Sequence, residues 1–197
     1  ETDTRASYGL SKHNYHLPLS AQKTLANLKG TVGERMRDGQ WIGLDRLIYG
    51  AYPAGIFVGS MPDPSLMQSW YISIDYGYTN PTFLLLAGVD CDGRVWIYKE
   101  YEKSRMLHKD ILDWLRMFQE KAPVIVVDPS AAGLIAEIQS NGFTCIKANN
   151  DVKIGIDKAR DVMAGGMVRA YSECQNLRRS LSGYVRKEDG NPEKEDD

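Results

Sequence analysis

Two aspartates in this sequence stand where a ligand site would be expected. Asp75 follows the apolar segment 70–74, and Asp128 follows the run of β-branched residues at 124–127. If both segments are strands, each aspartate lies at a carboxyl end, where open α/β sheets form the crevice that binds ligands. Two carboxylates in one poorly solvated crevice repel each other unless a proton or a cation compensates their charge. Oxygen ligands of this kind select hard cations, so the pair predicts a site for Mg²⁺ or Mn²⁺.

The chemistry that such a site supports is hydrolysis of a phosphodiester bond. Two divalent ions about 3.5–4 Å apart can activate a water molecule and stabilise the leaving oxygen. Taken singly, each aspartate has an ordinary explanation, because Asp before Gly or Pro at a strand end usually forms a turn or caps a helix. We predict catalysis for Asp75 and Asp128 because of their joint placement, which requires their two strands to be neighbours.

The surrounding pattern predicts three consecutive antiparallel strands, followed by alternating helices and strands. Asp92-Gly93 is a strong hairpin signal between the second and third strands. Apolar residues at three-to-four-residue spacing indicate an amphipathic helix over 107–121. We expect the strand at 124–128 to be buried on both faces and parallel to its neighbours, and Ser130 to cap the helix that follows. The predicted strands are 71–75, 82–89, 94–101, 124–128, 143–148 and 167–171, and the predicted helices are 107–121, one between Ser130 and Asn141, 153–164 and a last one that begins near Leu177.

This order indicates an α/β fold with a mixed β-sheet flanked by helices, as in ribonuclease H-like proteins. In that arrangement the first and fourth strands are neighbours, so Asp75 and Asp128 would converge although they are far apart in the sequence. A regular doubly wound fold would need a helix between the first two strands. Residues 76–93 are too short and too strand-like to provide one.

Composition limits the classes of protein that the chain can belong to. Its 197 residues are 43% hydrophobic and 25% charged, which is typical of a globular domain and excludes a disordered or collagen-like chain. The net charge of −2 offers no general basic excess, so any DNA contact must be local. The longest apolar run, residues 83–89, is far too short to span a bilayer. The three cysteines are far apart and lack metal-ligand spacing, which predicts free thiols.

Residues 1–64 differ in pattern from the rest of the chain. This segment contains one expected short helix, at 20–28, and is rich in turn-forming residues near its end. We predict a linker or docking segment over 1–64 and the main folded domain over 65–197. Because the sequence starts without Met, we expect it to be part of a longer polypeptide.

Several short motifs together carry a resemblance to a known family. Segments 74–81 (IDYGYTNP) and 126–132 (VVDPSAA) are similar to those of the nuclease domain of the large terminase subunit of tailed double-stranded DNA phages. Residues 28–31 and 39–41 resemble the stretch that joins the packaging ATPase of that family to its nuclease, and residues 184–187 resemble a hairpin strand beside the active site. The resemblance covers most of the chain. Each motif is weak by itself, but their combination is specific.

The resemblance implies a metal-dependent endonuclease that cuts concatemeric viral DNA during genome packaging in the host cytoplasm, with two Mg²⁺ or Mn²⁺ ions. Asp75 and Asp128 match the first two of three catalytic and metal-binding aspartates. The third lies on a final helix in a pattern like Asp-His-x-x-Asp-Ala, which we expect just beyond Asp197. The implied partners are an ATPase domain in the full-length protein, the portal protein and the small terminase subunit. The ATPase's phosphate-binding pattern, GxxxxGK[ST], does not occur in this sequence.

Four basic residues are candidates for contact with double-stranded DNA. Arg178, Arg179, Arg186 and Lys187 cluster near the end of the sequence, and clustered Lys and Arg neutralise phosphates without reading base sequence. A solvated helix face explains so small a cluster equally well. We expect His108, by contrast, to be an ordinary surface residue.

Two other functions fit the same residues. Another ribonuclease H-like nuclease, of the resolvase or transposase type, would share the acidic pair. A DNA or portal docking module would bind without cutting, because a site without its third aspartate is weakened. Metal-dependent cleavage that is lost in Asp75→Ala separates the enzymes from the docking module.

Overall fold

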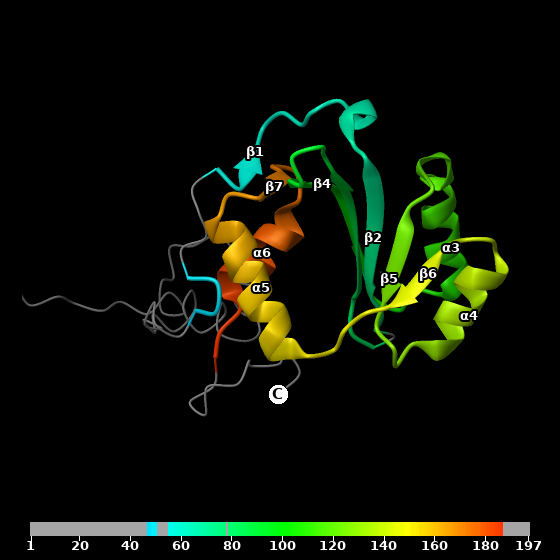
Figure 1. The fold of residues 1–197 in the computed structure, drawn as a ribbon. Coiled ribbons are helices and arrows are strands. Elements are labelled where there is room, and N and C mark those ends of the chain that lie inside the picture. The colour runs from blue at the N-terminus through cyan, green and yellow to red at the C-terminus, as the bar shows by residue number, and fades with distance from the viewer. Residues whose placement is uncertain (1–46, 51–54, 78, 187–197) are drawn as a thin grey trace, which may run out of the picture. The chain divides into compact units, whose positions relative to one another are not determined.

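The computed structural model describes residues 47–50, 55–77 and 79–186 (Figure 1). The chain divides into two units, one formed by Glu1–Ala51 with Ser180–Asp197 and the other by Tyr52–Arg179. The predicted helix at 20–28 and Lys187 lie outside the described residues, as does most of the predicted linker segment. The predicted boundary between a linker and a main domain therefore stays a prediction.

The larger unit is built around a mixed sheet of seven strands, in the order β1-β7-β4-β3-β2-β5-β6. Strands β2, β3 and β4 pair antiparallel, and every other pairing in the sheet is parallel. This confirms the predicted α/β fold and the antiparallel start of the sheet. The strands are β1 (Phe57–Val58), β2 (Ser69–Asp75), β3 (Thr82–Val89), β4 (Val95–Lys103), β5 (Val124–Val127), β6 (Cys145–Lys147) and β7 (Val168–Tyr171).

Helices lie on both sides of these strands, with α3 and α4 on one side and α5 and α6 on the other (Figure 1). Residues 180–183 at the end of α6 belong to the smaller unit. None of the described helices has the length and apolarity that a membrane span requires. The helices are α3 (His108–Arg116), α4 (Ala132–Ser140), α5 (Val152–Ala164) and α6 (Gln175–Gly183), with 3₁₀ turns at Pro64–Leu66 and Gln119–Lys121.

The helix predicted over 107–121 is shorter in the structure. The α-helical part ends at Arg116, and the chain continues as a 3₁₀ turn that ends at Lys121. Ala122 then takes a positive φ of 45° immediately before Pro123. Proline disfavours helical backbone in the residue before it, so the chain has to leave the helix here to start β5.

The core fills the space between the sheet and helices α3 and α4. Alternate residues of β2, including Ile72 and Ile74, are buried, as period-two alternation requires of a strand with one face on a core. Val127 and Ile125 of β5 continue this buried face. The prediction that β5 is buried on both faces was wrong, because its other residues are only half-buried. The face of β2 and β5 that points away from α3 and α4 is therefore partly open to solvent.

In the smaller unit, the described residues bring two distant segments together. Leu47 and Val185 form an antiparallel bridge, and the backbone N–H of Ile48 donates to the carbonyl oxygen of Tyr184 over 2.9 Å. The rings of Tyr49 and Tyr184 stack with their centroids 5.9 Å apart. These contacts attach the segment at 47–50 to the chain that follows α6.

Candidate active site

Asp75 and Asp128 lie at the ends of two neighbouring parallel strands. The last paired positions of β2 and β5 are Ile74 and Val127, and each aspartate is the next residue in its chain. Ile74 and Val127 are buried in the core, so the following side chains point to the opposite, open face. Asp75 is exposed on this face and Asp128 is half-buried. The strand register thus brings the two carboxylates side by side on one face of the sheet.

The two carboxyl groups have opposite pKa shifts. Partial desolvation by the surrounding chain raises the pKa of Asp75 above its ordinary value, and the negative charge of Asp128 raises it further. The pKa of Asp128 is lowered because Ser130, through its side chain and its backbone N–H, and then Asn150 hydrogen-bond to its ionised form. Of the two carboxyl groups, Asp75 therefore binds a proton more readily than Asp128.

Hydrogen bonds hold both oxygens of Asp128. The backbone N–H of Ser130 donates to Oδ1 over 2.7 Å, and Nδ2 of Asn150 donates to Oδ2 over 2.9 Å. The prediction that Ser130 caps α4 was wrong, since the residue at the cap position is Ala131, which makes no side-chain cap. The turn after β5 instead directs the Ser130 N–H toward the carboxylate two residues earlier.

The loop after Asp75 is anchored at two points. The buried Thr82 hydroxyl donates to the carbonyl oxygen of Gly77 over 2.8 Å. Gly77 has no room for a side chain, because a Cβ there would lie 2.9 Å from the backbone oxygen of Asn80. On the other side, the rings of Tyr76 and His108 meet edge to face, with centroids 5.2 Å apart. These contacts fix the backbone directly after the first aspartate.

His108 is more than an ordinary surface residue. Its Nδ1 lies 2.7 Å from Oε2 of Glu137 on α4, and its ring is half-buried against Tyr76. The three residues come from α3, α4 and the loop after β2. Their contacts connect helices α3 and α4 to the loop that follows Asp75. The expectation drawn from sequence missed this role because Glu137 lies far from His108 in the chain.

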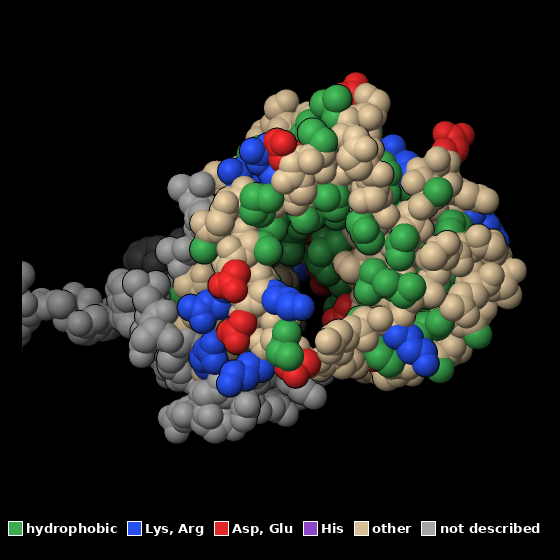
Figure 2. Space-filling model, viewed as in Figure 1, with side chains coloured by type: hydrophobic (Ala, Val, Ile, Leu, Met, Phe, Trp, Pro, Cys, Tyr) green, Lys and Arg blue, Asp and Glu red, His purple; other side chains and the backbone are tan. Residues whose placement is uncertain are grey.

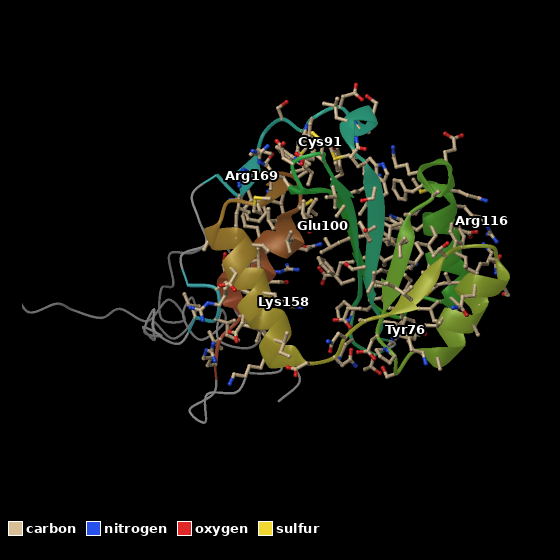
Figure 3. The ribbon with its side chains drawn as sticks, viewed as in Figure 1. Tyr76, Cys91, Glu100, Arg116, Lys158 and Arg169 are labelled. Atoms are coloured by element: carbon tan, nitrogen blue, oxygen red, sulfur yellow. The ribbon has the colours of Figure 1, made fainter. Side chains whose placement is uncertain are left out.

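A hollow opens beside the acidic pair's face of the sheet. Figure 2 shows the surface hollowed between α5 and the strands, with acidic side chains in its depth and basic ones on the α5 side. Lys158 of α5 and Tyr76 after β2 lie on opposite sides of this hollow (Figure 3).

Of the predicted DNA-binding residues, Arg178 and Arg179 on α6 each contact a different part of the fold. Arg178 of α6 lies over the ring of Phe57, with its guanidinium carbon 4.0 Å from the centroid. Arg179 forms an ion pair with Glu102 at 3.2 Å. Arg186 belongs to the smaller unit, and Lys187 lies outside the described residues. A role of these residues in DNA contact stays a prediction.

The acidic pair suits a hard divalent cation. Carboxylate oxygens are the ligands that such ions prefer, and the negative charge of Asp128 is one of the causes that raise the pKa of Asp75, after desolvation. A cation bound at the pair would relieve this repulsion. Within the described part of the chain, no group of three or more His, Cys, Asp or Glu residues is placed to hold a metal. The described site thus offers two carboxylates, with remaining positions open to water or substrate.

Comparison with known proteins identifies the fold. No family model matches the chain, and no curated protein matches it. Among solved structures, the large terminase of a thermophilic bacteriophage in complex with ADP matches with a TM-score of 0.70 and 28% identity, covering 92% of this chain and 49% of that protein. The P22 large terminase nuclease domain matches with a TM-score of 0.64 and 16% identity over 75% of this chain and 83% of that domain.

The chain has the fold of large terminase nuclease domains. The resemblance that the motifs around Asp75 and Asp128 predicted is thereby confirmed. The nuclease domain of the SPP1 large terminase, solved with bound Mn, also shares this nuclease fold, with a TM-score of 0.52 and 17% identity over 66% of this chain and 77% of that domain. This terminase-like chain spans about half the length of the thermophilic-phage large terminase.

One residue of the candidate site was missed by sequence reasoning. Asn150 was not singled out, although it follows the strand predicted at 143–148 and so lies at the same end of the sheet as Asp128. The polar run 149–151 directly after a strand beside β5 was the available signal. The contact itself could not be predicted, because it depends on the course of the turn between β6 and α5.

Proposed function

We propose that the chain is the nuclease part of a phage DNA-packaging terminase, an endonuclease that hydrolyses phosphodiester bonds of double-stranded DNA with divalent metal ions. The observation that supports this most is the adjacency of Asp75 and Asp128 on paired strands, in a fold shared with the P22 nuclease domain. The 28% identity to the thermophilic-phage large terminase over nearly the whole chain supports the packaging role.

Asp75 and Asp128 are the residues that would hold Mg²⁺ or Mn²⁺, and we propose a site for two such ions. A divalent ion bound there would supply a nucleophilic water at neutral pH and neutralise charge on the phosphodiester. The role of Asp128 is to present an oriented, ionised carboxylate, which its two hydrogen bonds favour. Asp75 binds a proton more readily than Asp128, so a proton and a cation should compete for Asp75.

Contact with the DNA backbone would come from basic residues around the hollow and on α6. Lys158 lies on the α5 side of the hollow, and Arg178 and Arg179 stand next to each other on α6. We include Arg186 and Lys187 as further phosphate contacts. Such contacts give affinity that is independent of base sequence and falls with salt concentration. A packaging nuclease needs that property, because it meets the whole length of the genome.

The whole protein would combine this chain with an ATPase domain and work with a portal protein and a small terminase subunit in the host cytoplasm. This proposal extends from the likeness to the thermophilic-phage large terminase, of which the chain covers 49%. This proposal is independent of the proposed chemistry of the acidic pair, which can be tested with the chain alone.

A non-cleaving DNA or portal docking module is the second candidate. It is favoured by the finding that the described residues place only two acidic groups together, with no third His, Cys, Asp or Glu beside them. In this case DNA would bind but would not be cut. No observation in the described part of the fold favours a resolvase or transposase over a terminase nuclease.

Cleavage of supercoiled plasmid in the presence of Mn²⁺ tests the proposal. The wild-type chain should cut, EDTA should abolish cutting, and Asp75→Ala should lower the rate by about 100-fold or more, a loss in the range expected for removing a metal ligand. Asp92→Asn is a matched control, because Asp92 is an exposed aspartate at the β3–β4 turn. Plasmid binding without cutting by the wild-type chain would favour the docking module.

A further inference from the structure

The turn between β6 and α5 is set in register with the end of β5. Val127 of β5 pairs with Lys147 of β6, and the backbone N–H of the next residue, Ala148, donates to the carbonyl oxygen of Val127 over 2.8 Å. Strand β6 and the residue after it therefore run beside β5 as far as Val127, the residue before Asp128. The following residues, 149–151, must turn within reach of that aspartate.

Each of the three residues in this turn makes a different hydrogen bond. Oδ1 of Asn149 accepts from the backbone N–H of Asp151 over 3.0 Å, which closes the turn. Oδ1 of Asp151 accepts from the backbone N–H of Ile154 over 3.0 Å, which caps α5. Asn150 reaches another segment, through its Nδ2 to Oδ2 of Asp128. Its two neighbours shape the turn and present its side chain.

The contact fixes the orientation of the Asp128 carboxylate. The Ser130 N–H holds Oδ1 from the residue's own loop, and Asn150 holds Oδ2 from a loop 22 positions along the chain. Two donors on two different oxygens restrict rotation about the bond that carries the carboxylate. An ionised carboxylate accepts hydrogen bonds at about four lone-pair positions, so both oxygens keep positions for a further ligand.

Stability of the fold does not explain this contact. Asn150 is exposed, and both hydrogen bonds to Asp128 lie at the surface. Water would solvate a carboxylate at the surface nearly as well as the amide of Asn150 does, so the contact adds little to folding. What water would not provide is a fixed direction for the two Asp128 oxygens, whose charge acts on Asp75. Partners that orient a ligating carboxylate act in this way at metal sites.

We propose that Asn150 is a positioning residue, which orients the Asp128 carboxylate toward Asp75 and so sets the affinity of the acidic pair for a divalent cation. This inference rests on the proposed function, because it assumes that the pair binds a metal. Asn150 acts through Asp128 and has no contact with the reacting atoms in the proposal. Its removal should therefore weaken metal binding while leaving the chemistry accessible at high metal concentration.

Titration of Mn²⁺ into the metal-free chain, followed by the EPR signal of free Mn²⁺, tests the proposal. Asn150→Ala should weaken Mn²⁺ binding about tenfold, the lower end of the effect of removing a partner of a metal ligand. Asn149→Ala is the matched control, because it disturbs the same turn through the hydrogen bond to Asp151, and it should change the affinity less than about twofold. Plasmid cleavage by Asn150→Ala should recover toward the wild-type rate as Mn²⁺ is raised, whereas Asp75→Ala should not recover.

The possible outcomes separate this inference from the proposed function. Wild-type binding of Mn²⁺ that is unchanged in Asn150→Ala would overturn the role of Asn150 and leave the metal site intact. An equal loss in Asn149→Ala would also overturn it, since the turn as a whole would then be responsible. A wild-type chain that binds no Mn²⁺ would overturn the proposed metal site and, with it, this role.

Discussion

Ile74 and Val127 pair with each other on the adjacent parallel strands β2 and β5, and Asp75 and Asp128 are the residues that directly follow them. The pairing that places Ile74 and Val127 in the core therefore also places the two carboxylates together on the other face. A shift of one residue in this register would bury one aspartate and separate the pair. The same hydrophobic packing that stabilises the sheet thus maintains two like charges at close range, where a cation can compensate them.

The first prediction concerns the pH dependence of stability in EDTA. Because the folded chain raises the pKa of Asp75, ionisation of this residue opposes folding, and the stability it contributes is lost as pH rises through that pKa. Asp75→Asn carries no charge, so it should be more stable than wild type at pH 7, by about 0.5 kcal/mol for an exposed group. Below the pKa of the unfolded aspartate, the difference should vanish. Urea unfolding at several pH values measures it.

The effect of Asp128 on the pH dependence of stability has the opposite sign. Its lowered pKa contributes stability that is present at neutral pH and is lost as pH falls through that pKa. Asp128→Asn should therefore be less stable than wild type at pH 7. Mn²⁺ should stabilise wild type more than either variant, because a ligand that binds only the folded chain raises its stability. Equal effects of pH on wild type and Asp75→Asn would show that the two carboxylates do not interact.

The second prediction concerns the attachment of α6 to the sheet. The two carboxylate oxygens of Glu100 on β4 accept from the backbone N–H groups of Asn176 and Leu177, each over 2.8 Å, at the start of α6. Glu100→Ala leaves these half-buried donors without their charged acceptor and should lower the free energy of unfolding by about 2 kcal/mol.

Glu102→Ala is the control from the same strand, because it removes the ion pair with the exposed Arg179. Its cost should be below about 1 kcal/mol, as for other surface ion pairs. Chemical denaturation of both variants compares them directly. Equal losses would mean that the helix-end hydrogen bonds of Glu100 have no special weight.

The third prediction concerns the packing that supports β2. Gly88 pairs with Trp70 across β3 and β2, and a Cβ at Gly88 would lie 2.5 Å from Cγ of Met67. Gly88→Ala should therefore destabilise the chain by about 1–3 kcal/mol through overpacking. Gly155→Ala is the contrasting change, since nothing lies within 4 Å of a Cβ there on α5. It should stabilise the chain by about 0.5–1 kcal/mol because alanine favours a helix more than glycine does. Thermal or urea unfolding decides both signs.

Much of the fold could be predicted from local patterns. The strand predicted at 82–89 has those bounds in β3, because the continuous apolar run at 83–89 and the hairpin signal at Asp92-Gly93 agree. The apolar run before Asp128 correctly predicted a strand with parallel neighbours. Its half-open face was not predicted, since an unbroken run of β-branched residues carries no information about what covers each side. That open face is the one that carries the acidic pair.

The parts of the site that escaped prediction are contacts between distant loops. Ser130 matches a helix cap by residue type, but its N–H is turned toward Asp128 by the conformation of the bend. Asn150 and Glu137 act on residues more than twenty positions away, at distances that only the assembled sheet determines. Lys187 and the segment before Leu47 lie outside the described residues, so what the sequence predicts for them stays a prediction.

The central claim is that Asp75 and Asp128 together bind a divalent cation, and the most direct measurement is crystallographic. Crystals of the chain grown with Mn²⁺ and measured near the manganese absorption edge should show an anomalous peak between the two carboxylates, within about 2.0–2.3 Å of an oxygen from each. The same peak should be absent from crystals of Asp75→Asn. Wild-type crystals that bind manganese elsewhere, or at only one of the two aspartates, would contradict the claim.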